Sequence, residues 1–496
     1  MNKFYITTAI PYVNAKPHIG HALEFVQADV VARYHRLKGE DMLLLSGADE
    51  NALKNVQAAE KAGVPVQQFI DENAKLFAEL AEKLGVQFGV FQKGSSKDHH
   101  LASQKLWELC AKAGDIYKKS YEGLYCVGCE TFYTEGELDA NKECFEHPGR
   151  KLEMVAEENY FFKLSKYQDK LLEIIEQDEL KIFPVTRKNE VLAFLSQPLQ
   201  DISISRSNER AKNWGVSVPG DDSQKMYVWF DALNIYQSGV GFGLDEEKYK
   251  KWWPADVHVI GKGITRFHAV YWPAFLLSAG LVLPKTLFVH GYITVNGQKM
   301  SKSTGNVVDP CELVAKYGAD AVRYFLLREI PATEDGDFSY EKFKTRYNAD
   351  LANGLGNQVS RVLALAIRHG IKPELLDRRV VINEWEGRGL WRHLENFEFA
   401  KALELIWQGL PEESSIVPQG FWDVYSVSGI SDSTEAHRPF DPKTSAVDRD
   451  RDIVNNLTAL WRIAVALEPF LPQAAENIVQ QLQSNESHPL FPRIET

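Results

Sequence analysis

The sequence predicts an α/β fold, in which a largely parallel sheet with helices on both sides is split by an insertion and followed by an all-helical domain. Residues 1–115 alternate apolar segments with segments of helical periodicity, as a parallel sheet requires. Residues 116–225 open with a stretch rich in Cys, Gly, Glu and aromatic residues, so we assign them to the insertion. The strand-and-helix pattern resumes in residues 226–347, and residues 348–496 have almost purely helical periodicity.

The first part of the α/β domain is expected to contain two strands and two helices. Residues 3–8 predict a strand, and residues 18–37 a helix with its apolar positions near one face. Residues 42–46 form a nearly continuous apolar run, typical of a strand buried on both faces, and residues 66–84 are again helical.

The later elements follow from the same patterns. Strands are expected at residues 227–230, 257–260 and 286–290. Helices of the last domain are expected at residues 363–368, 397–407 and 454–468.

Composition and charge exclude several classes of protein. The chain has 496 residues, with 56 Lys and Arg against 68 Asp and Glu, and a formal net charge of −12. An acidic chain of ordinary hydrophobic content is not a non-specific duplex-binding protein, although a local basic track for one structured RNA remains compatible. The most apolar stretch, residues 267–283, is too short and interrupted to span a membrane, and the amino terminus lacks signal-peptide features. We therefore expect a cytoplasmic protein.

Four residues with metal-ligand side chains have the spacing of paired zinc knuckles: Cys126, Cys129, Cys144 and His147. Thiolates and imidazole in this number close a tetrahedral site, so we expect one structural zinc per chain. The alternative is three unrelated cysteines and a surface histidine. Cys110 and Cys311 lie in helical patterns and are expected to be inert core thiols.

A second candidate site lies between the first strand and the first helix, in Pro17-His18-Ile19-Gly20-His21. The amino terminus of a helix binds anions, Gly20 permits close approach to the backbone, and the two histidines fall on one face. They can donate hydrogen bonds to phosphate. Alone, the pattern also fits two capping or surface histidines.

The third candidate is Lys299-Met300-Ser301-Lys302-Ser303, which follows an apolar strand and the turn Asn296-Gly297. Two lysines and several hydroxyls on a loop suit a polyphosphate whose charge develops during transfer. Alone, such a loop is more often solvated surface.

The two motifs together, in this order in a split α/β domain, resemble the paired signatures of class I aminoacyl-tRNA synthetases. "AIPYVN" at residues 9–14, "QDISISR", "YVWFDAL", "YWP" and "HGYITVNGQKMSKS" narrow the resemblance to the methionyl-tRNA synthetases. The resemblance runs from residue 1 to about residue 407 and returns near Asn455, and the knuckle matches the single-knuckle form of that family.

The resemblance implies a Rossmann-like catalytic domain and roles for individual residues. Residues that would bind ATP are His18, Gly20, His21, Gly261, Lys299, Ser301, Lys302 and Ser303. Of these, His18, His21, Lys299 and Lys302 would act in catalysis, and Mg²⁺ would accompany ATP. Residues that would bind methionine are Ile10, Tyr12, Asp49, Trp229, Leu233, Tyr236, Phe267 and His268. Asp49 would pair with the ammonium group, and the aromatic side chains would contact the thioether.

Two positions depart from the family pattern. Methionyl enzymes usually carry His-Gly after Asp-Glu, whereas this chain has Asn51-Ala52, and they usually carry Gly-Lys-Asp where this chain has Gly261-Lys262-Gly263. The missing carboxylate normally holds the ribose, so nucleotide binding should be weakened but not abolished.

Asn357 and Arg361 match the pair with which the family contacts the anticodon, and Trp422 lies near the position of its usual third partner. However, residues 408–451 do not resemble the family. They are rich in Pro, Ser, Gly and Asp, so we expect an irregular, weakly packed segment. Compensating frameshifts in the coding sequence and a lineage-specific insertion both remain open as explanations.

The implied function is ATP-dependent ligation of L-methionine to tRNA(Met) through methionyl-adenylate, for translation initiation and elongation. A synthetase for leucine, isoleucine, valine or cysteine is the alternative within the class, and an RNA-binding protein that has lost turnover is the alternative outside it. With no room for an appended tRNA-binding barrel, a monomer is expected.

Overall fold

The computed structural model describes residues 2–126, 131–133, 136, 138–144, 149, 151–300, 305–411 and 446–494. The chain divides into two compact units. The first comprises Met1–Tyr292, Val307–Cys311 and Thr333–Asp335, and the second comprises Ile293–Asn306, Glu312–Ala332 and Gly336–Thr496.

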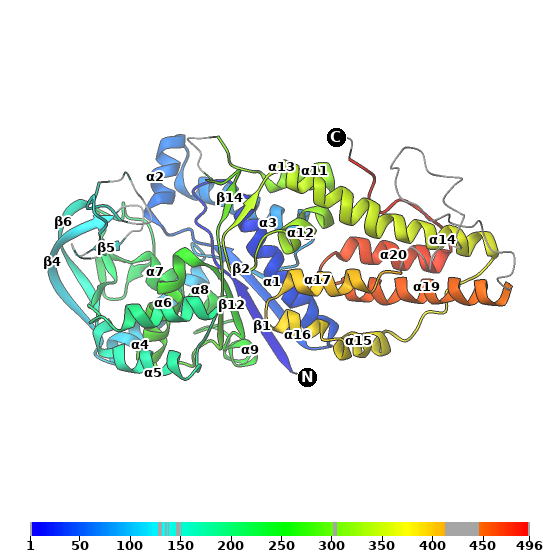
Figure 1. Ribbon diagram of the computed structural model, residues 1–496. Coiled ribbons are helices and arrows are strands. Elements are labelled where there is room, and N and C mark those ends of the chain that lie inside the picture. Colours follow the sequence, from blue (N-terminus) through cyan, green and yellow to red (C-terminus); the bar gives the residue numbers. More distant parts are fainter. Residues whose placement is uncertain are drawn as a thin grey trace. The chain divides into compact units, whose positions relative to one another are not determined.

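The first unit is built around a six-stranded parallel sheet of order β3-β2-β1-β12-β13-β7 (Figure 1). Its strands are β1 (Lys3–Thr8), β2 (Asp41–Ala48), β3 (Val90–Lys93), β7 (Lys181–Phe183), β12 (Val257–Gly261) and β13 (Thr286–His290). β1 pairs with both β2 and β12, so the order of the strands reverses direction next to β1. Ligands of such sheets bind beyond the carboxyl ends of the strands at this kind of position.

Helices connect the strands of the sheet, as the alternating pattern predicts. They include α1 (Ile19–Leu37), α2 (Leu53–Ala62), α3 (Val66–Lys83), α4 (Lys97–Lys112) and α10 (Trp272–Ser278). α1 follows β1 and is buried along most of its length, since its apolar side chains face the sheet. The predicted elements at residues 3–8, 18–37, 42–46 and 66–84 are thus confirmed to within about three residues.

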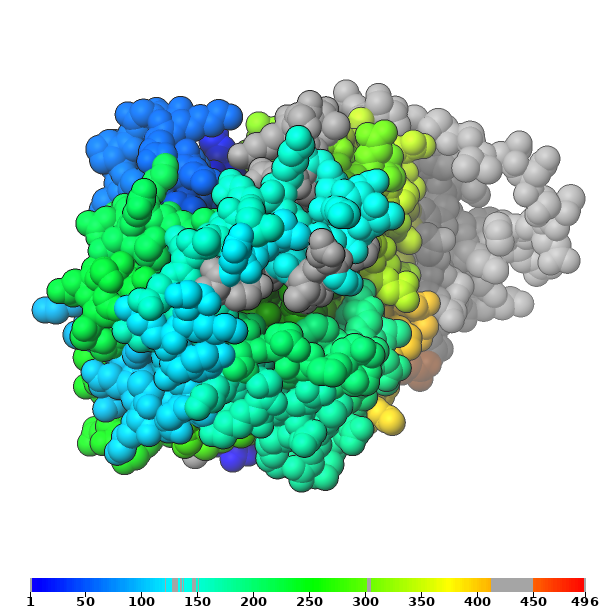
Figure 2. Space-filling view, turned by 90° about the vertical axis from the view of Figure 1, so that its left-hand side faces the viewer, coloured from blue at the N-terminus to red at the C-terminus, as the bar shows by residue number. Residues whose placement is uncertain are grey.

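The insertion contains two antiparallel sheets. One has the order β5-β4-β6-β8, with the long strands β4 (Ile116–Cys126) and β6 (Glu153–Phe162) at its centre and β5 (Thr131–Tyr133) and β8 (Ile202–Ser203) at its edges. The other has the order β10-β11-β9, formed by β10 (Ser217–Val218), β11 (Asp221–Met226) and β9 (Ser205–Ser207). Cyan to green segments from this part of the chain form most of the surface seen in Figure 2. β7, which also lies in this range, forms an edge strand of the parallel sheet beside β13.

The strand predicted at residues 227–230 is wrong. The chain forms a short helix there, α7 (Val228–Ala232), and every residue of this helix is buried. An apolar run of four residues without polar alternation fits a helix surrounded by protein as well as a buried strand. The strands predicted at residues 257–260 and 286–290 are confirmed as β12 and β13.

The second unit is mainly helical. Besides a small sheet of β14 (Ile293–Val295), β15 (Gln298–Lys299) and β16 (Gly336–Phe338), it contains α12 (Ala319–Arg328), α14 (Asn357–His369), α17 (Phe399–Gln408), α19 (Ala446–Leu467) and α20 (Pro472–Ser484). α14, α19 and α20 pack side by side (Figure 1). Buried Arg323 of α12 donates to the carbonyl oxygens of Pro469 and Phe470, and the Asp320 carboxylate accepts from the Ala474 amide of α20 at 2.6 Å.

Most of the segment predicted to be irregular, residues 408–451, lies outside the described residues, and so does Trp422. At its ends the expectation is wrong, because Gln408 closes α17 and residues 446–451 belong to the first turns of α19. The Asp-Arg repeat that ends the segment is compatible with a solvated helix face.

In the part of the chain that the structure describes, none of the helices is both long enough and apolar enough to cross a bilayer.

Candidate active site

His18 and His21 form the amino-terminal cap of α1. The His18 Nδ1 accepts a hydrogen bond from the Gly20 amide at 3.1 Å, and the His21 Nδ1 accepts one from the His18 amide at 3.1 Å. The two rings lie 3.9 Å apart between centroids. A capping role and a phosphate-binding role are therefore compatible here, since each ring uses only one nitrogen for the cap.

The caps fix which nitrogen of each neutral ring carries the proton. A nitrogen that accepts from an amide has no hydrogen, so the neutral form of each ring carries its hydrogen on Nε2. Burial, with the neighbouring His18 and His290, lowers the pKa of His21 well below its usual value. At neutral pH, His21 is therefore an uncharged hydrogen-bond donor at the amino terminus of a helix.

Gly261 ends β12 opposite His290 of β13. Gly263, which replaces the family's usual carboxylate, lies in a short 3₁₀ turn, Lys262–Ile264. The Lys262 Nζ is 2.7 Å from the Asp335 carboxylate, whose other oxygen accepts from the Tyr292 amide. A carboxylate thus lies next to this turn, but it is paired with Lys262.

Four of the predicted methionine-binding side chains form one aromatic cluster. Trp229 of α7 stacks on Phe267 with ring centroids 3.9 Å apart and planes at 4°. It meets Tyr12 and His268 edge-on, with centroids 6.3 Å apart in both pairs. Phe267 and His268 belong to a π-helical turn, Phe267–Tyr271. The structure brings together residues that lie more than 250 positions apart in the sequence.

A buried chain of hydrogen bonds holds His268, one member of this cluster, in place. The His268 Nδ1 is 3.0 Å from the Ile264 carbonyl oxygen, which can only accept, so Nδ1 carries the hydrogen. The His268 Nε2 then accepts from the Tyr236 hydroxyl at 2.8 Å. Burial lowers the pKa of His268 to about 4 and raises that of Tyr236 well above its usual value, so both groups are neutral.

We expect stability to fall on acidification because of His268. Its pKa of about 4 in the folded protein lies below the unfolded value of about 6.5, so the unfolded chain binds more protons between these values. The group should cost about 2 kcal/mol of unfolding free energy between pH 7 and pH 5. Urea unfolding should show a pH dependence smaller by this amount in His268→Gln than in the unchanged protein. An unaltered pH dependence in His268→Gln would contradict this account.

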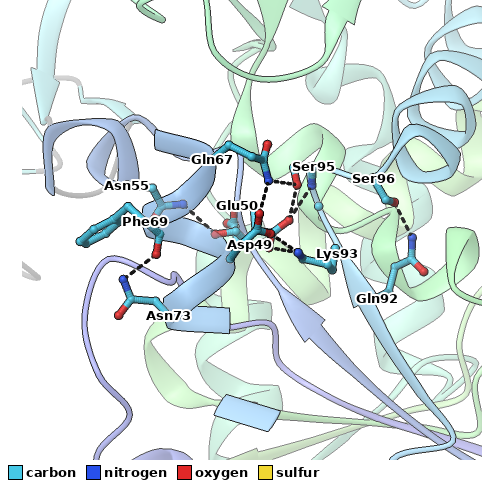
Figure 3. A network of polar contacts seen from close by, with 12 residues as sticks. Asp49, Glu50, Asn55, Gln67, Phe69, Asn73, Gln92, Lys93, Ser95 and Ser96 are labelled. Atoms are coloured by element: carbon cyan, nitrogen blue, oxygen red, sulfur yellow. Dashed lines mark hydrogen bonds and ion pairs between the residues drawn. The ribbon is translucent and has the colours of Figure 1, made fainter. Parts of the chain in front are cut away.

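The segment that carries Asp49 is held from several directions. The Asp49 amide donates to the Pro11 carbonyl at 3.0 Å, and Asn55 donates to the Asp49 carbonyl at 2.8 Å. Buried Glu50 accepts from the amide and the hydroxyl of Ser95 at 2.9 and 2.6 Å. Figure 3 shows Asn55 on one side of this segment and Ser95 on the other. Asp49 itself is buried.

Sequence patterns did not reveal the roles of Glu50, which belongs to this segment, or of Ser95 and the buried Asp231, which reach it from other elements. The signal for Glu50 was its place beside Asp49, but its partner lies 45 residues away. Asp231 stands in the "YVWFDAL" motif, yet its contact with Asn51 spans 180 positions. Pairings of this kind depend on tertiary structure.

The lysine-rich loop begins in the second unit. Lys299 ends β15 and is exposed, and its carbonyl oxygen accepts from the Asn306 side chain at 3.2 Å. Ser301, Lys302 and Ser303 lie outside the described residues. Asn357 and Arg361 stand one turn apart at the start of α14, so they share one side of that helix.

Of the four predicted zinc ligands, the structure describes Cys126 and Cys144. Both are buried, and their sulfurs lie 3.3 Å apart. Two sulfurs bound to one tetrahedral zinc would be about 3.8 Å apart, so the two thiols are near enough to share a site but lie closer than two zinc ligands would. Cys129 and His147 lie outside the described residues. Among the residues with described positions, no group of three or more metal-binding side chains is assembled. Cys110 is buried, with a pKa raised by burial to about 12, as an inert thiol should be, whereas Cys311 is only half-buried.

Comparisons with known proteins agree with the fold and the motifs. Residues 4–363 match the family described as tRNA synthetases class I (M). The methionine–tRNA ligase of Brucella suis is 39% identical over 97% of this chain and 92% of its own length, and that of Mycobacterium bovis is 47% identical over 74% and 71%. A structure of Mycobacterium tuberculosis methionyl-tRNA synthetase with methionyl-adenylate superposes with a TM-score of 0.83 at 38% identity, covering 97% of this chain and 93% of that one. The chain therefore belongs to the methionine branch of the class I aminoacyl-tRNA synthetases.

Proposed function

We propose that this methionine–tRNA ligase activates methionine at the site formed by the cap of α1, Asp49 and the aromatic cluster around Trp229. The methionine carboxylate attacks the α-phosphate of ATP, which gives methionyl-adenylate and releases pyrophosphate. The terminal adenosine hydroxyl of tRNA(Met) then attacks the adenylate, which forms the ester and releases AMP. The observation that carries the proposal is the joining of Trp229, Phe267, His268 and Tyr12 in one cluster within the unit that also holds His18 and His21.

Binding of phosphate is assigned to the two capping histidines and the lysine-rich loop. The Nε2–H donors of His18 and His21 suit phosphate oxygens whose charge grows in the transition state. Lys299 and Lys302 are proposed to bind the β- and γ-phosphates, with Ser301 and Ser303 shaping the loop and Gly20 and Gly261 allowing the nucleotide close to the backbone. Mg²⁺ bound to ATP would neutralise part of the charge of its phosphates.

Methionine recognition is assigned to a charge interaction with the ammonium group and to apolar contacts with the thioether side chain. The buried Asp49 carboxylate would pair with the ammonium group. The thioether would lie against Trp229 and Phe267, where sulfur–aromatic contact is worth roughly 0.3–1.5 kcal/mol. Ile10, Leu233 and Tyr236 complete the apolar surroundings.

A structural zinc is proposed at Cys126, Cys129, Cys144 and His147, supported by the proximity of the Cys126 and Cys144 thiols. Purified protein should contain about one zinc per chain. Cys129→Ala should lose the metal and loosen the insertion while the α/β core stays folded. Elemental analysis and limited proteolysis would measure this, with half-buried Cys311→Ala as the matched control. Unchanged protein without stoichiometric metal would refute the site.

Further assignments are proposals of the same kind. We assign residues 1–115 and 226–347 to the catalytic domain, 116–225 to the insertion and 348–496 to anticodon binding. In the last, Asn357 and Arg361 would contact the anticodon, with Trp422 as the third partner. A cytoplasmic monomer is the form expected.

Charging of a tRNA(Met) transcript tests the complete reaction. Efficient formation of methionyl-tRNA, lost when the anticodon is changed, is the expected result. Methionine activation without charging would restrict the function to the first step. It would favour the interpretation that the 408–451 segment disables the anticodon site.

A further inference from the structure

Asn51 connects the two elements to which we assign methionine recognition. Its Nδ2 donates to the Gly94 carbonyl oxygen at 2.8 Å and to the Asp231 Oδ2 at 2.5 Å. Asn51 lies two residues after Asp49, and Asp231 lies two residues after Trp229 on α7. Because an amide nitrogen carries two hydrogens, one side chain makes both bonds.

Gly94, which accepts one of these bonds, lies close to the chain that leaves β2. The Gly94 amide donates to the Ala48 carbonyl at 3.0 Å, so the end of β3 follows the chain that leaves β2. A Cβ at Gly94 would stand 3.0 Å from the Ala48 oxygen and 3.1 Å from the Glu50 nitrogen, and 3.6 Å from the Asn51 Nδ2. The absence of a side chain there allows the end of β3 to lie close to Ala48 and Glu50, whereas a Cβ would be at ordinary contact distance from the Asn51 amide.

Asp231 is a buried carboxylate with partners from two elements. Asn51 approaches its Oδ2 from the chain after β2, and the His99 Nε2 lies 3.6 Å from the same oxygen. The His99 Nδ1 is 2.9 Å from the Ser238 hydroxyl, which anchors the ring on α8 (Ile235–Ser238). A buried carboxylate needs hydrogen-bond donors, and removal of the Asn51 donor leaves Asp231 underpaired.

We propose that Asn51 is a positioning residue of the methionine site, which fixes the distance between Asp49 and Trp229. This inference rests on the proposed function of those two residues. The ammonium group of methionine must reach Asp49 while its thioether reaches Trp229. A variable distance between these two side chains would therefore weaken binding of the amino acid. The family usually has His at this position, and an imidazole N–H can also donate to the Asp231 carboxylate.

Pyrophosphate-exchange kinetics of the full-length protein would test the proposal. Asn51→Ala should raise the KM for methionine about tenfold while the KM for ATP stays within about twofold. Asn51→His should recover most of the loss. Asn51→Asp, which keeps the shape but turns the donors into an acceptor facing Asp231, should be at least as impaired as the alanine variant. Asn73→Ala is the matched control, because its amide donates to the Phe69 carbonyl within α3.

The possible outcomes distinguish failure of the positioning role from failure of the proposed function. A methionine KM within twofold of the unchanged protein in both Asn51→Ala and Asn51→Asp would overturn the positioning role alone. Equal increases in both KM values with a lowered melting temperature would also overturn it, in favour of a purely structural role. Absence of methionine-dependent exchange in the unchanged protein would instead overturn the proposed function, and this inference with it.

Discussion

Replacing His21 by Asn is expected to slow methionyl-adenylate formation by about 10²–10³-fold, with little change in methionine affinity. The Asn side chain can keep the acceptor at the position of Nδ1 and so preserve the cap to the His18 amide. It cannot place a donor where Nε2–H lies. Loss of one preorganised donor to developing charge costs about this factor. Rapid-quench measurement of adenylate formation, with methionine binding measured separately, would show the effect.

Two further variants locate the cause of this loss. His21→Gln, which can place an amide donor near the Nε2 position, should be less impaired than His21→Asn. His35→Asn changes a histidine of the same helix that stacks on Phe4 and contacts Glu40, so its rate should be unchanged. An equal loss in methionine affinity at unchanged rate in His21→Asn would contradict a role in phosphate binding.

Trp229→Ala is expected to lower kcat/KM for methionine roughly 30-fold, which corresponds to about 2 kcal/mol. The lost terms are burial of the thioether against the ring and the sulfur–aromatic contact. Trp229→Phe should retain most activity, because a smaller ring can still stack on Phe267. Steady-state exchange over a range of methionine concentrations would measure both variants.

Trp107 provides the control for general loss of packing. It is buried in the same unit against Tyr160 and Phe230, neither of which is assigned to methionine binding. Trp107→Ala should lower stability by about 3–5 kcal/mol without raising the KM for methionine. If Trp229→Ala and Trp107→Ala changed the KM equally, the aromatic cluster would not be the methionine site.

Sequence patterns predicted the elements that are buried on all sides along a short apolar strand or along one regular face of a helix. The strand at residues 286–290 is apolar because β13 is covered on both faces, and α1 follows directly from its periodicity and its cap. Residues 227–230 were mistaken for a strand because a fully buried short helix has no polar face to reveal its period.

The candidate site could be predicted in its parts but not in its connections. Motifs identified His18, His21 and Trp229, whereas the bond from Asn51 to Asp231 joins positions 180 residues apart and left no local pattern. The protonation of the histidines likewise depends on contacts that only the fold supplies, such as the Ile264 carbonyl at His268. At residues 446–451, the charged Asp-Arg repeat lacks apolar periodicity, so the start of α19 could not be predicted from the sequence.

Amino-acid-dependent ATP–pyrophosphate exchange tests the central claim most directly. The protein should catalyse exchange with methionine, with a kcat/KM at least about 100-fold above those for leucine, isoleucine, valine and cysteine. Exchange supported equally well by one of these amino acids, or no exchange with methionine at all, would contradict the account.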